Sequence, residues 1–529
     1  MDTTRVRAIF VAAIVMAFAV GAYSYRARAA SKGAQEGAPG TSSNSADYLH
    51  WPLPAADQKY GSIDGKHIWQ YVKEQSAIAE KYRDDGHPQF WGRIVGTSGD
   101  VEDIQWLQDK YKQAGLTDVH AQPINLFLPQ WSAQSWTVAV TAGGNTVPLS
   151  SAQPPYGSPD TGGKDLDLEA VYVGLGSEAD FAGRDVKGKA VLIVRAGSGF
   201  SYNIGPADVM KRAEDAGAAA LLDFDLRGGN YNIQAYRSYT TVPTFELGTQ
   251  DGEKIRDLIG KAHGGDAPHF KIRLDAKWEP QMTALVWGTL PGQTDETIYV
   301  IAHRDGWFDA AGDNASGVAS MLGLAEYFGK LPKAQRRRTM VFIGTDGHHQ
   351  ILPGGYGRVW LTANRGKYFS KTALLINEEH PSEVMTHGGV AGWSNTNIPM
   401  EWYAGGESRP QLTKIAMDAF REFGVPIWDE PTKTGGDDLG AFYWYVPGLS
   451  ATSNDFLNMH TTADTPDNVP WAGLEATTRA YAKIIDEVNK LPLSDLQRAA
   501  LSDPRAAGNA PLTQCAAWVQ DSSKGCNPN

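Results

Sequence analysis

The second half of the chain alternates between short β-branched runs and segments whose apolar positions recur at helical spacing. The run at 297–302 predicts a buried strand, and the apolar residues at 318–328 predict one face of a helix. Further strands are expected at 284–287, 338–344, 372–377 and 448–453, and further helices near 356–363, 411–423 and 471–491. This alternation predicts an α/β fold in which helices sandwich a mixed, mostly parallel sheet.

The first half of the chain begins with predicted amphipathic helices and then becomes rich in short predicted strands. Amphipathic helices are predicted at 64–82 and 101–114, followed by a turn and an exposed strand at 115–124. Short strands separated by Gly-rich turns are then predicted at 136–140, 169–173, 189–194, 219–223 and 241–246. One helix is predicted among them, at 207–216. We expect a β-rich module inserted in the α/β domain, where it would shape access to the site. The predicted division is 60–125 and 281–491 for the α/β domain, 126–280 for the insertion, and 492–529 for a C-terminal tail.

The first 30 residues have the features of a targeting segment. Arg5 and Arg7 precede an apolar run at 8–25, and Ala27-Arg28-Ala29 is a candidate cleavage signal. We therefore expect a signal peptide at 1–30, a linker at 31–59, and export to the periplasm or the medium. The apolar run is also long enough to span a bilayer, so an uncleaved N-terminal anchor is the alternative.

Composition limits the possible partners. The 529 residues are 42% hydrophobic and 20% charged, which fits a globular protein with a sizeable core. A net charge of −12 argues against a nucleic-acid surface, because phosphate binding needs clustered Lys and Arg. Cys515 and Cys526 have no histidine beside them, so a local disulfide is favoured over a zinc site. The oligomeric state is not indicated.

Potential metal ligands follow four of the predicted strands. They are His303, Asp305, Asp309 and Asp313; His348 and His349; Glu378, Glu379 and His380; and His460 and Asp464. Because the carboxyl ends of parallel strands meet at one edge of a sheet, we expect these side chains to converge and to bind a metal. For the first cluster, the alternative is that Asp313 or Ser316 caps the helix and His303 is a satisfied polar residue.

These motifs resemble a known family. The motifs are His303-Arg304-Asp305 with Trp307, Gly312-Asp313-Asn314 with Ser316-Gly317, Ile376-Asn377-x-Glu379, and His460-Thr461-x-x-Asp464-Thr465. Together they look like the di-zinc exopeptidases, which include bacterial aminopeptidases and glutamate carboxypeptidase. The inserted module resembles the protease-associated domain that the carboxypeptidase-like members carry. The resemblance covers roughly residues 60–490.

The resemblance implies a role for each motif residue. Asp313 would bridge two Zn²⁺ ions, with His303 and Glu379 holding one of them. His460 would hold the other together with the second residue of the family's Glu-Glu pair, and the first Glu of that pair would be the general base. Asp305 would orient His303.

The chain departs from the family at the Glu-Glu pair, where it has His348 and His349. His349 is a sound zinc ligand, and His348 would act either as the base or as a further ligand. The loss of two carboxylates removes two negative charges and favours a single bound metal over two. Another divalent metal in place of Zn²⁺ is a separate alternative. Another alignment would bring Asp346 or Glu378 to the base position. Glu379 stands at a position where the family more often has Asp. Both residues ligate zinc through oxygen, and the Glu side chain is longer by one methylene group.

The substrate is less defined than the metal site. The segment at 448–453 lacks the arginines that the carboxypeptidases present to a terminal carboxylate, so a preference for acidic C-terminal residues is not expected. Asp438, in a Gly-Gly-Asp-Asp turn, is the candidate for binding a cationic or amino group, with a solvated turn as the alternative. The resulting hypothesis is an exported, metal-dependent hydrolase of peptide or small amide substrates. The other hypotheses are a non-catalytic relative and a metalloenzyme of another reaction class, since two His and one carboxylate also suit iron.

Overall fold

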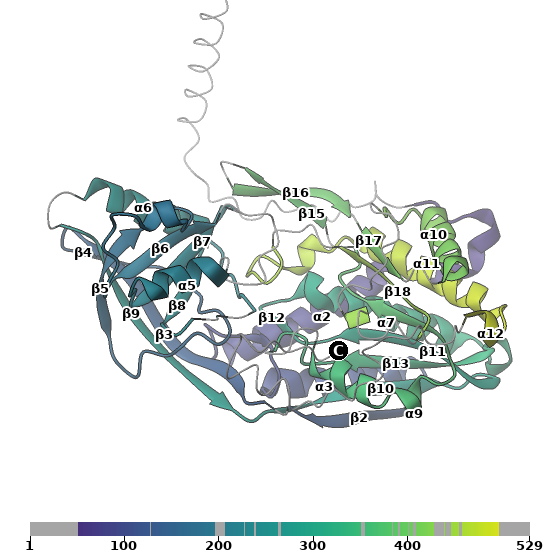
Figure 1. Cartoon of the computed structure of the whole chain (residues 1–529). Helices are drawn as coiled ribbons and strands as arrows, with labels where there is room; N and C mark the ends of the chain where they lie inside the picture. The colour runs from purple at the N-terminus through teal and green to yellow at the C-terminus, as the bar shows by residue number, and fades with distance from the viewer. Residues whose placement is uncertain are drawn as a thin grey trace, which may run out of the picture. The chain divides into compact units, whose positions relative to one another are not determined.

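The computed structural model describes residues 51–496, except 127, 196–206, 227, 237, 239, 263–265, 351–354, 383, 390–391, 400, 406–408, 428–437, 440–445 and 454–457. The predicted targeting segment and both cysteines lie outside the described residues. Of the helices within these ranges, none is long and apolar enough to cross a membrane. The predicted α/β class is confirmed (Figure 1).

A seven-stranded mixed sheet forms the centre of the α/β part. Its order from edge to edge is β17 (Glu401–Gly405), β18 (Gly448–Ser453), β14 (Thr372–Glu378), β11 (Thr294–His303), β13 (Arg338–Thr345), β10 (Met282–Leu290) and β2 (Thr117–Asn125). The four inner strands β18, β14, β11 and β13 are parallel, and the outer strands pair antiparallel. The four predicted ligand clusters therefore follow adjacent parallel strands.

Helices cover both faces of this sheet because its strands are apolar on both sides. One face packs Val300, Phe342 and Ile376 against helices whose bounds are α2 (Gly65–Asp84), α3 (Ser98–Gln113), α7 (Ser316–Lys330), α10 (Pro410–Phe423) and α11 (Trp471–Asn489). The other face packs Tyr299 and Ile301 against α8 (Tyr356–Ala363) and α9 (Arg365–Tyr368) with Phe369. The result is a three-layer sandwich.

Two of the covering helices begin at a side-chain cap. The Asp64 carboxylate accepts a hydrogen bond from the Lys66 backbone N–H at 2.8 Å, and the Thr97 hydroxyl accepts one from Asp100 at 3.3 Å. Helix α7 has no side-chain cap and is buried along most of its length. Its position depends on packing against the sheet and on the turn that precedes it.

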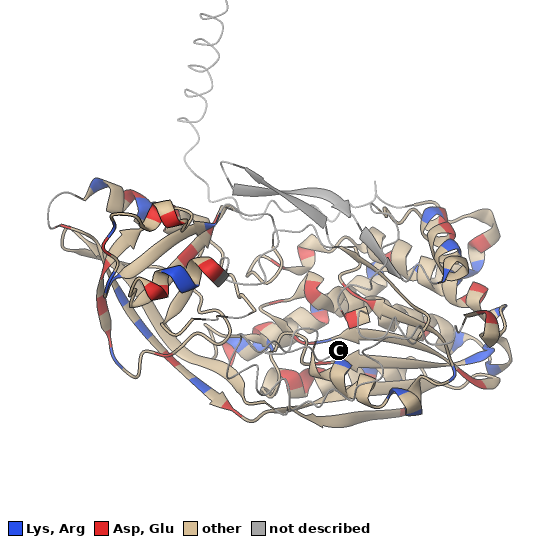
Figure 2. Cartoon of the chain, in the orientation of Figure 1, with Lys and Arg blue, Asp and Glu red and all other residues tan. Residues whose placement is uncertain are grey.

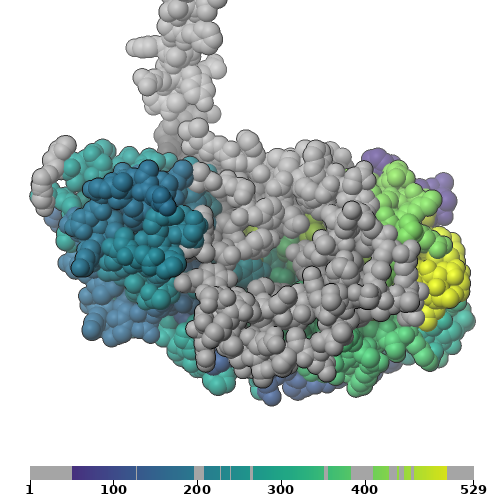
Figure 3. All heavy atoms as spheres, in the orientation of Figure 1, coloured from purple at the N-terminus to yellow at the C-terminus, as the bar shows by residue number. Residues whose placement is uncertain are grey.

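A second seven-stranded sheet is built from residues between 130 and 279. Its order is β4 (Asn145–Pro148), β3 (Gln130–Ala142), β9 (His269–Glu279), β5 (Leu166–Tyr172), β6 (Ala190–Arg195), β7 (Ala220–Asp225) and β8 (Thr244–Leu247). It is accompanied by α4 (Glu178–Phe181), α5 (Ala207–Asp215) and α6 (Thr249–Lys261). In the space-filling view, blue and teal residues from this part of the chain gather on the left (Figure 3). Strand β9 and helix α6 are absent from the sequence-based expectation.

The remaining described elements are short. They are η2 (Ala55–Ser62), β1 (Gly92–Arg93), β12 (Gly306–Trp307), η3 (Ala311–Ala315), η4 (Lys333–Gln335), β15 (Val384–Gly389), β16 (Gly392–Pro399), η6 (Pro466–Asn468) and α12 (Leu493–Leu496). On the face drawn in Figure 2, acidic and basic residues are interspersed along the described helices α5, α6 and α10. This mixed pattern differs from the basic stripe that phosphate binding requires.

Candidate metal centre

Four parallel strands deliver the polar side chains to one edge of the central sheet. Strand β11 ends at His303, and β13 leads directly into the turn that carries His348 and His349. Strand β14 leads into Glu379 and His380, and the chain reaches His460 after β18. This is the edge at which open α/β sheets place their ligands, because the loops after neighbouring parallel strands meet there.

The first ligand group consists of His303, Asp313, Glu379 and His380, all of them buried. The His303 Nε2 atom lies 3.2 Å from Asp313 Oδ1 and 3.1 Å from Glu379 Oε1. The His380 Nε2 atom lies 3.1 Å and 3.4 Å from the same two oxygens. We call these four residues group A.

The second ligand group consists of Asp313, His349 and His460. The other oxygen of Asp313, Oδ2, lies 3.0 Å from His349 Nε2 and 2.7 Å from His460 Nε2. The two imidazole Nε2 atoms are 3.3 Å apart. We call these three residues group B. Asp313 is therefore shared, with one carboxylate oxygen facing each group.

The backbone around Asp313 is fixed by a second aspartate. Asp464 accepts hydrogen bonds from the backbone N–H of Gly312 at 2.7 Å and of Asp313 at 3.2 Å. Asn314 donates to the Glu378 carbonyl at 2.8 Å, and its Oδ1 accepts from the His380 N–H at 3.0 Å. These contacts join the turn before α7 to the end of β14, so the ligands from the two segments are positioned together.

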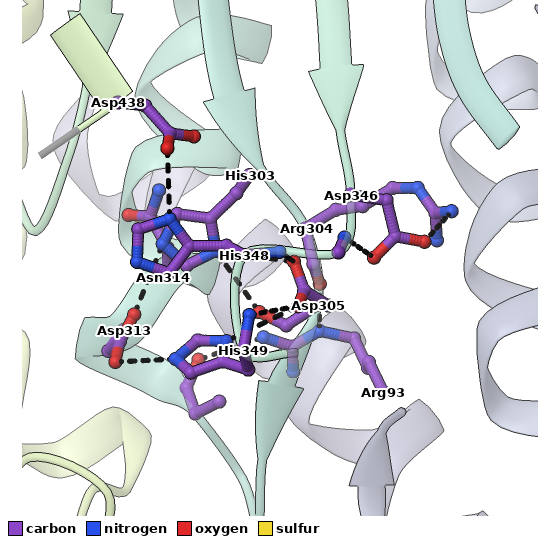
Figure 4. Close-up of polar contacts among 12 residues, drawn as sticks. Arg93, His303, Arg304, Asp305, Asp313, Asn314, Asp346, His348, His349 and Asp438 are labelled. Atoms are coloured by element: carbon purple, nitrogen blue, oxygen red, sulfur yellow. Dashed lines mark hydrogen bonds and ion pairs between the residues drawn. The ribbon is translucent and has the colours of Figure 1, made fainter. Parts of the chain in front are cut away.

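The Asp305 carboxylate lies on the Nδ1 side of the His303 and His349 rings (Figure 4). Its carboxylate accepts hydrogen bonds from the backbone N–H of His348 at 3.2 Å and of His349 at 2.8 Å. Its oxygens also lie 3.6 Å from His303 Nδ1 and 3.4 Å from His349 Nδ1. One carboxylate therefore fixes the turn after β13 and faces the rings of both ligand groups.

His348 lies beside the ligand groups without belonging to either of them. Its ring stacks on His303, with centroids 4.1 Å apart and an interplanar angle of 11°. Its Nδ1 atom is 3.1 Å from Oδ1 of Asp438, a residue that is only 2% exposed (Figure 4). The structure thus places Asp438, predicted to bind substrate, against His348.

Burial and neighbouring charges compete in setting the pKa values of the ligands. Burial acts to lower the pKa of His303, but the carboxylates, Glu379 foremost, hold it well above its usual range. Burial also opposes charge on His349, whereas Asp313 raises its pKa to about 8. For His460 burial prevails and lowers the pKa to about 4. Burial would raise the pKa of Asp313, but His349 and His380 keep it well below its usual range.

The arrangement of donors fits a divalent metal. Asp313 Oδ1 is buried and accepts no hydrogen bond from the described residues, although two imidazole nitrogens face it. Near pH 7 Asp313 is ionised and His460 neutral, as metal binding requires, whereas the raised pKa values of His303 and His349 mean that an incoming metal would displace protons from these two rings. Imidazole and carboxylate donors suit zinc and other first-row metals.

The structure brings together every residue predicted for the site: His303, Asp305, Asp313, His348, His349, Glu379, Asp438 and His460. The two alternative bases lie elsewhere. Asp346 pairs with the buried Arg304 beside Asp100, and Glu378 belongs to none of the ligand groups among the described residues. Asp309 is also outside them; its backbone carbonyl accepts a hydrogen bond from Arg93 at 2.8 Å.

Two neighbours of the site were given no individual role from the sequence. His380 was expected only as a member of the cluster that follows the strand at 372–377, and Tyr236 was not identified. Tyr236 comes from the segment between β7 and β8 and stacks on His349, with centroids 5.5 Å apart and planes at 12°. It also meets His460 edge-on at 4.8 Å. No local pattern near Tyr236 indicates this contact, which joins residues more than a hundred positions apart.

Parts of the chain match known protein families. Residues 286–485 match the family model for Peptidase family M28, and residues 155–255 match the PA domain. "Probable glutamate carboxypeptidase VP8" from Zea mays is 24% identical over 49% of this chain, which spans only 40% of that protein's length. Leucine aminopeptidase 2 from Arthroderma otae is 24% identical over 53% of each chain.

Solved structures share the fold. A Peptidase M28 precursor from Shewanella amazonensis has a TM-score of 0.64 at 16% identity, covering 86% of this chain and 98% of that one. BSAP, a zinc aminopeptidase from Bacillus subtilis, has a TM-score of 0.59 at 18% identity, covering 82% and 98%. The chain therefore has a region similar to the M28 peptidases at 286–485, preceded along the sequence by a region similar to the PA domain at 155–255, and it shares the overall fold of these solved structures.

Proposed function

We propose that this chain, with its M28 peptidase domain and inserted PA domain, is a zinc-dependent exopeptidase that hydrolyses peptide or small amide substrates. The observation that carries the proposal is the division of one carboxylate between two ligand groups. Asp313 presents Oδ1 to group A and Oδ2 to group B, which is the arrangement expected for two neighbouring cations.

Group A and group B would each hold one zinc ion. Zinc bound there supplies Lewis-acid polarisation of the scissile carbonyl and lowers the pKa of bound water toward ~7. Asp305 and Asp464 hold the ligands in place before substrate arrives, because each accepts two backbone N–H groups in the turns that carry them.

His348 would accept the proton of the attacking water in place of the carboxylate that relatives use. The contact of its Nδ1 with Asp438 favours the tautomer that carries hydrogen on Nδ1, so Nε2 keeps the lone pair that a base needs. Asp438 is then a positioning residue. An interaction of Asp438 with a substrate amino group is the competing role.

The PA domain would limit access to the site. Tyr236 lies over both imidazoles of group B, and Gln234 donates its backbone N–H to the His460 carbonyl at 2.8 Å. We also propose that the chain is exported, on the basis of the basic and apolar pattern of residues 1–30. N-terminal sequencing of the mature protein checks this, with cleavage after Ala29 expected.

The proposed activity is tested by metal analysis together with a substrate panel. The purified chain should contain about two zinc ions and should hydrolyse aminoacyl anilides or short peptides, with activity lost in dipicolinate and restored by zinc. Peptides blocked at one end identify the end that is attacked. A normally folded protein that binds no metal, or one that binds zinc but leaves every unblocked peptide intact, contradicts the proposal.

A further inference from the structure

We infer that His380 is a fourth protein ligand in group A, so that this site is closed by side chains whereas group B keeps an open position. The inference rests on the proposed function in that it assumes a bound divalent metal. It concerns this chain's own sequence, in which a histidine directly follows the Glu379 ligand.

The ligating atoms of group A converge on one point. The Nε2 atoms of His303 and His380 each lie between 3.1 and 3.4 Å from the same two oxygens, Asp313 Oδ1 and Glu379 Oε1. All four donor atoms lie within 4.8 Å of one another. Such spacing leaves room for one small cation with two nitrogen and two oxygen ligands.

The second ring nitrogen fixes the orientation of each imidazole. His380 Nδ1 is 3.2 Å from the Ser453 carbonyl, and His303 Nδ1 is 3.2 Å from the Asp305 carbonyl. A carbonyl oxygen only accepts hydrogen bonds, so Nδ1 carries the hydrogen in both rings. In the neutral rings both Nε2 lone pairs then point toward carboxylate oxygens. A cation at the centre converts this repulsion into attraction.

A hydrogen bond to Asn314 fixes the backbone of His380. His380 has φ = 43°, a left-handed conformation that non-glycine residues rarely adopt. Its N–H donates to Asn314 Oδ1, and Asn314 follows the shared ligand Asp313 in the sequence. The conformation therefore turns the imidazole back toward Asp313.

The two ligand groups then differ in function. Four protein ligands fill a tetrahedral zinc site, whereas three leave one position for water. Group A would hold its ion more tightly, and group B would be the site at which water is activated. Zinc should consequently bind in two steps of different affinity.

Titration of the metal-free protein with zinc, in competition with a chromophoric chelator, tests the inference. Wild type should show two sites, and H380A should weaken the tighter one at least about 100-fold while changing the weaker one less than about threefold. H349A should instead weaken the weaker site. His269→Ala, at an exposed residue of β9, is the matched control and should change neither.

A measurement on the wild type covers the case in which H380A fails to fold. Fully cobalt-loaded protein should show four hyperfine-shifted imidazole N–H signals in NMR spectra, one for each histidine ligand. Three signals, or unchanged affinities in a folded H380A, overturn the inference and leave the proposed function intact. A wild type that binds no metal overturns the proposed function itself.

Discussion

At the scale of single residues, the proposed reaction depends most directly on the contact between His348 and Asp438. H348A should lower kcat by about 10²- to 10⁴-fold, the usual contribution of a general base, with zinc content unchanged. D438N should lower kcat less and leave KM nearly constant, because it acts through the tautomer of His348. A rise in KM alone would instead assign Asp438 to the substrate amino group.

His348→Glu is the matched variant for this position. It restores the carboxylate that relatives have there, so it should retain far more activity than H348A. Steady-state kinetics on one substrate, with zinc measured in each preparation, decides the comparison. Equal activity of H348A and wild type would remove His348 from the mechanism.

Asp309 makes stability depend on pH. Burial, together with the charges of Glu80 and Asp464, raises its pKa to about 7 in the folded chain, compared with about 3.9 when unfolded. Its contribution is therefore complete below pH ~4 and is lost as the pH rises through ~7. Relative to wild type, the free energy of unfolding of D309N should rise by about 2–3 kcal/mol from pH 5 to pH 8.

Urea unfolding at the two pH values measures this difference. Asp208→Asn, at an exposed residue of α5, is the control and should show no such trend. A parallel pH dependence of D309N and wild type would mean that Asp309 is ionised in the folded chain throughout.

The start of α7 is the most sensitive junction at the scale of elements. A Cβ atom at Gly317 would lie 2.4 Å from both Asn314 Oδ1 and the Glu378 carbonyl. Gly317→Ala should therefore separate α7 from β14, lower stability by about 1–3 kcal/mol and weaken zinc binding, since Asp313 and Glu379 lie on the two sides of this contact.

Gly366→Ala in α9 is the matched control, because nothing lies within 4 Å of a Cβ atom there. It should be neutral or slightly stabilising. Thermal unfolding and the zinc titration of both variants check the comparison. Wild-type zinc affinity in Gly317→Ala would show that the junction does not control the ligands.

Strands of the central sheet and the helices that cover it could be predicted because the periodicity of their apolar residues is a local feature of the sequence. Strand β11 and helix α7 have strong apolar periodicity, and the expected ranges at 297–302 and 318–328 fall inside the observed elements. Strand β9 was missed although Phe270, Ile272 and Leu274 alternate with charged residues and face the core. Its register is set by pairing with β3, which lies more than a hundred residues earlier.

The candidate site was predictable as far as it follows from strand ends. His303, His349, Glu379 and His460 all lie just after parallel strands or on the loops that follow them, so topology alone brings them together. Tyr236 was not predictable, since it reaches the site through the fold of a different sheet. The partnership of Asp438 with His348 is equally a product of tertiary structure.

Metal removal should affect the whole molecule. Ligand binding to the folded state adds ~3–4 kcal/mol when the free ligand exceeds Kd by 10²–10³. For a chain of this size, chelation should therefore lower the Tm by about 3–5 °C. Calorimetry with dipicolinate, followed by zinc or by calcium as the control ion, measures this, and only zinc should restore the Tm. An unchanged Tm would mean that the folded chain does not retain the metal.

The bridge between Ile233 and Thr461 places the PA-like module one residue away from His460, a candidate metal ligand. Gln234 and Asn232 extend the same contact, to the His460 carbonyl and to Thr462. If group B binds zinc as proposed, a molecule that binds the PA-like module and moves this segment is expected to change the affinity of group B for zinc. By thermodynamic reciprocity, bound zinc would change the affinity of that molecule for the PA-like module by the same factor. Binding at either site could then be measured through its effect on the other.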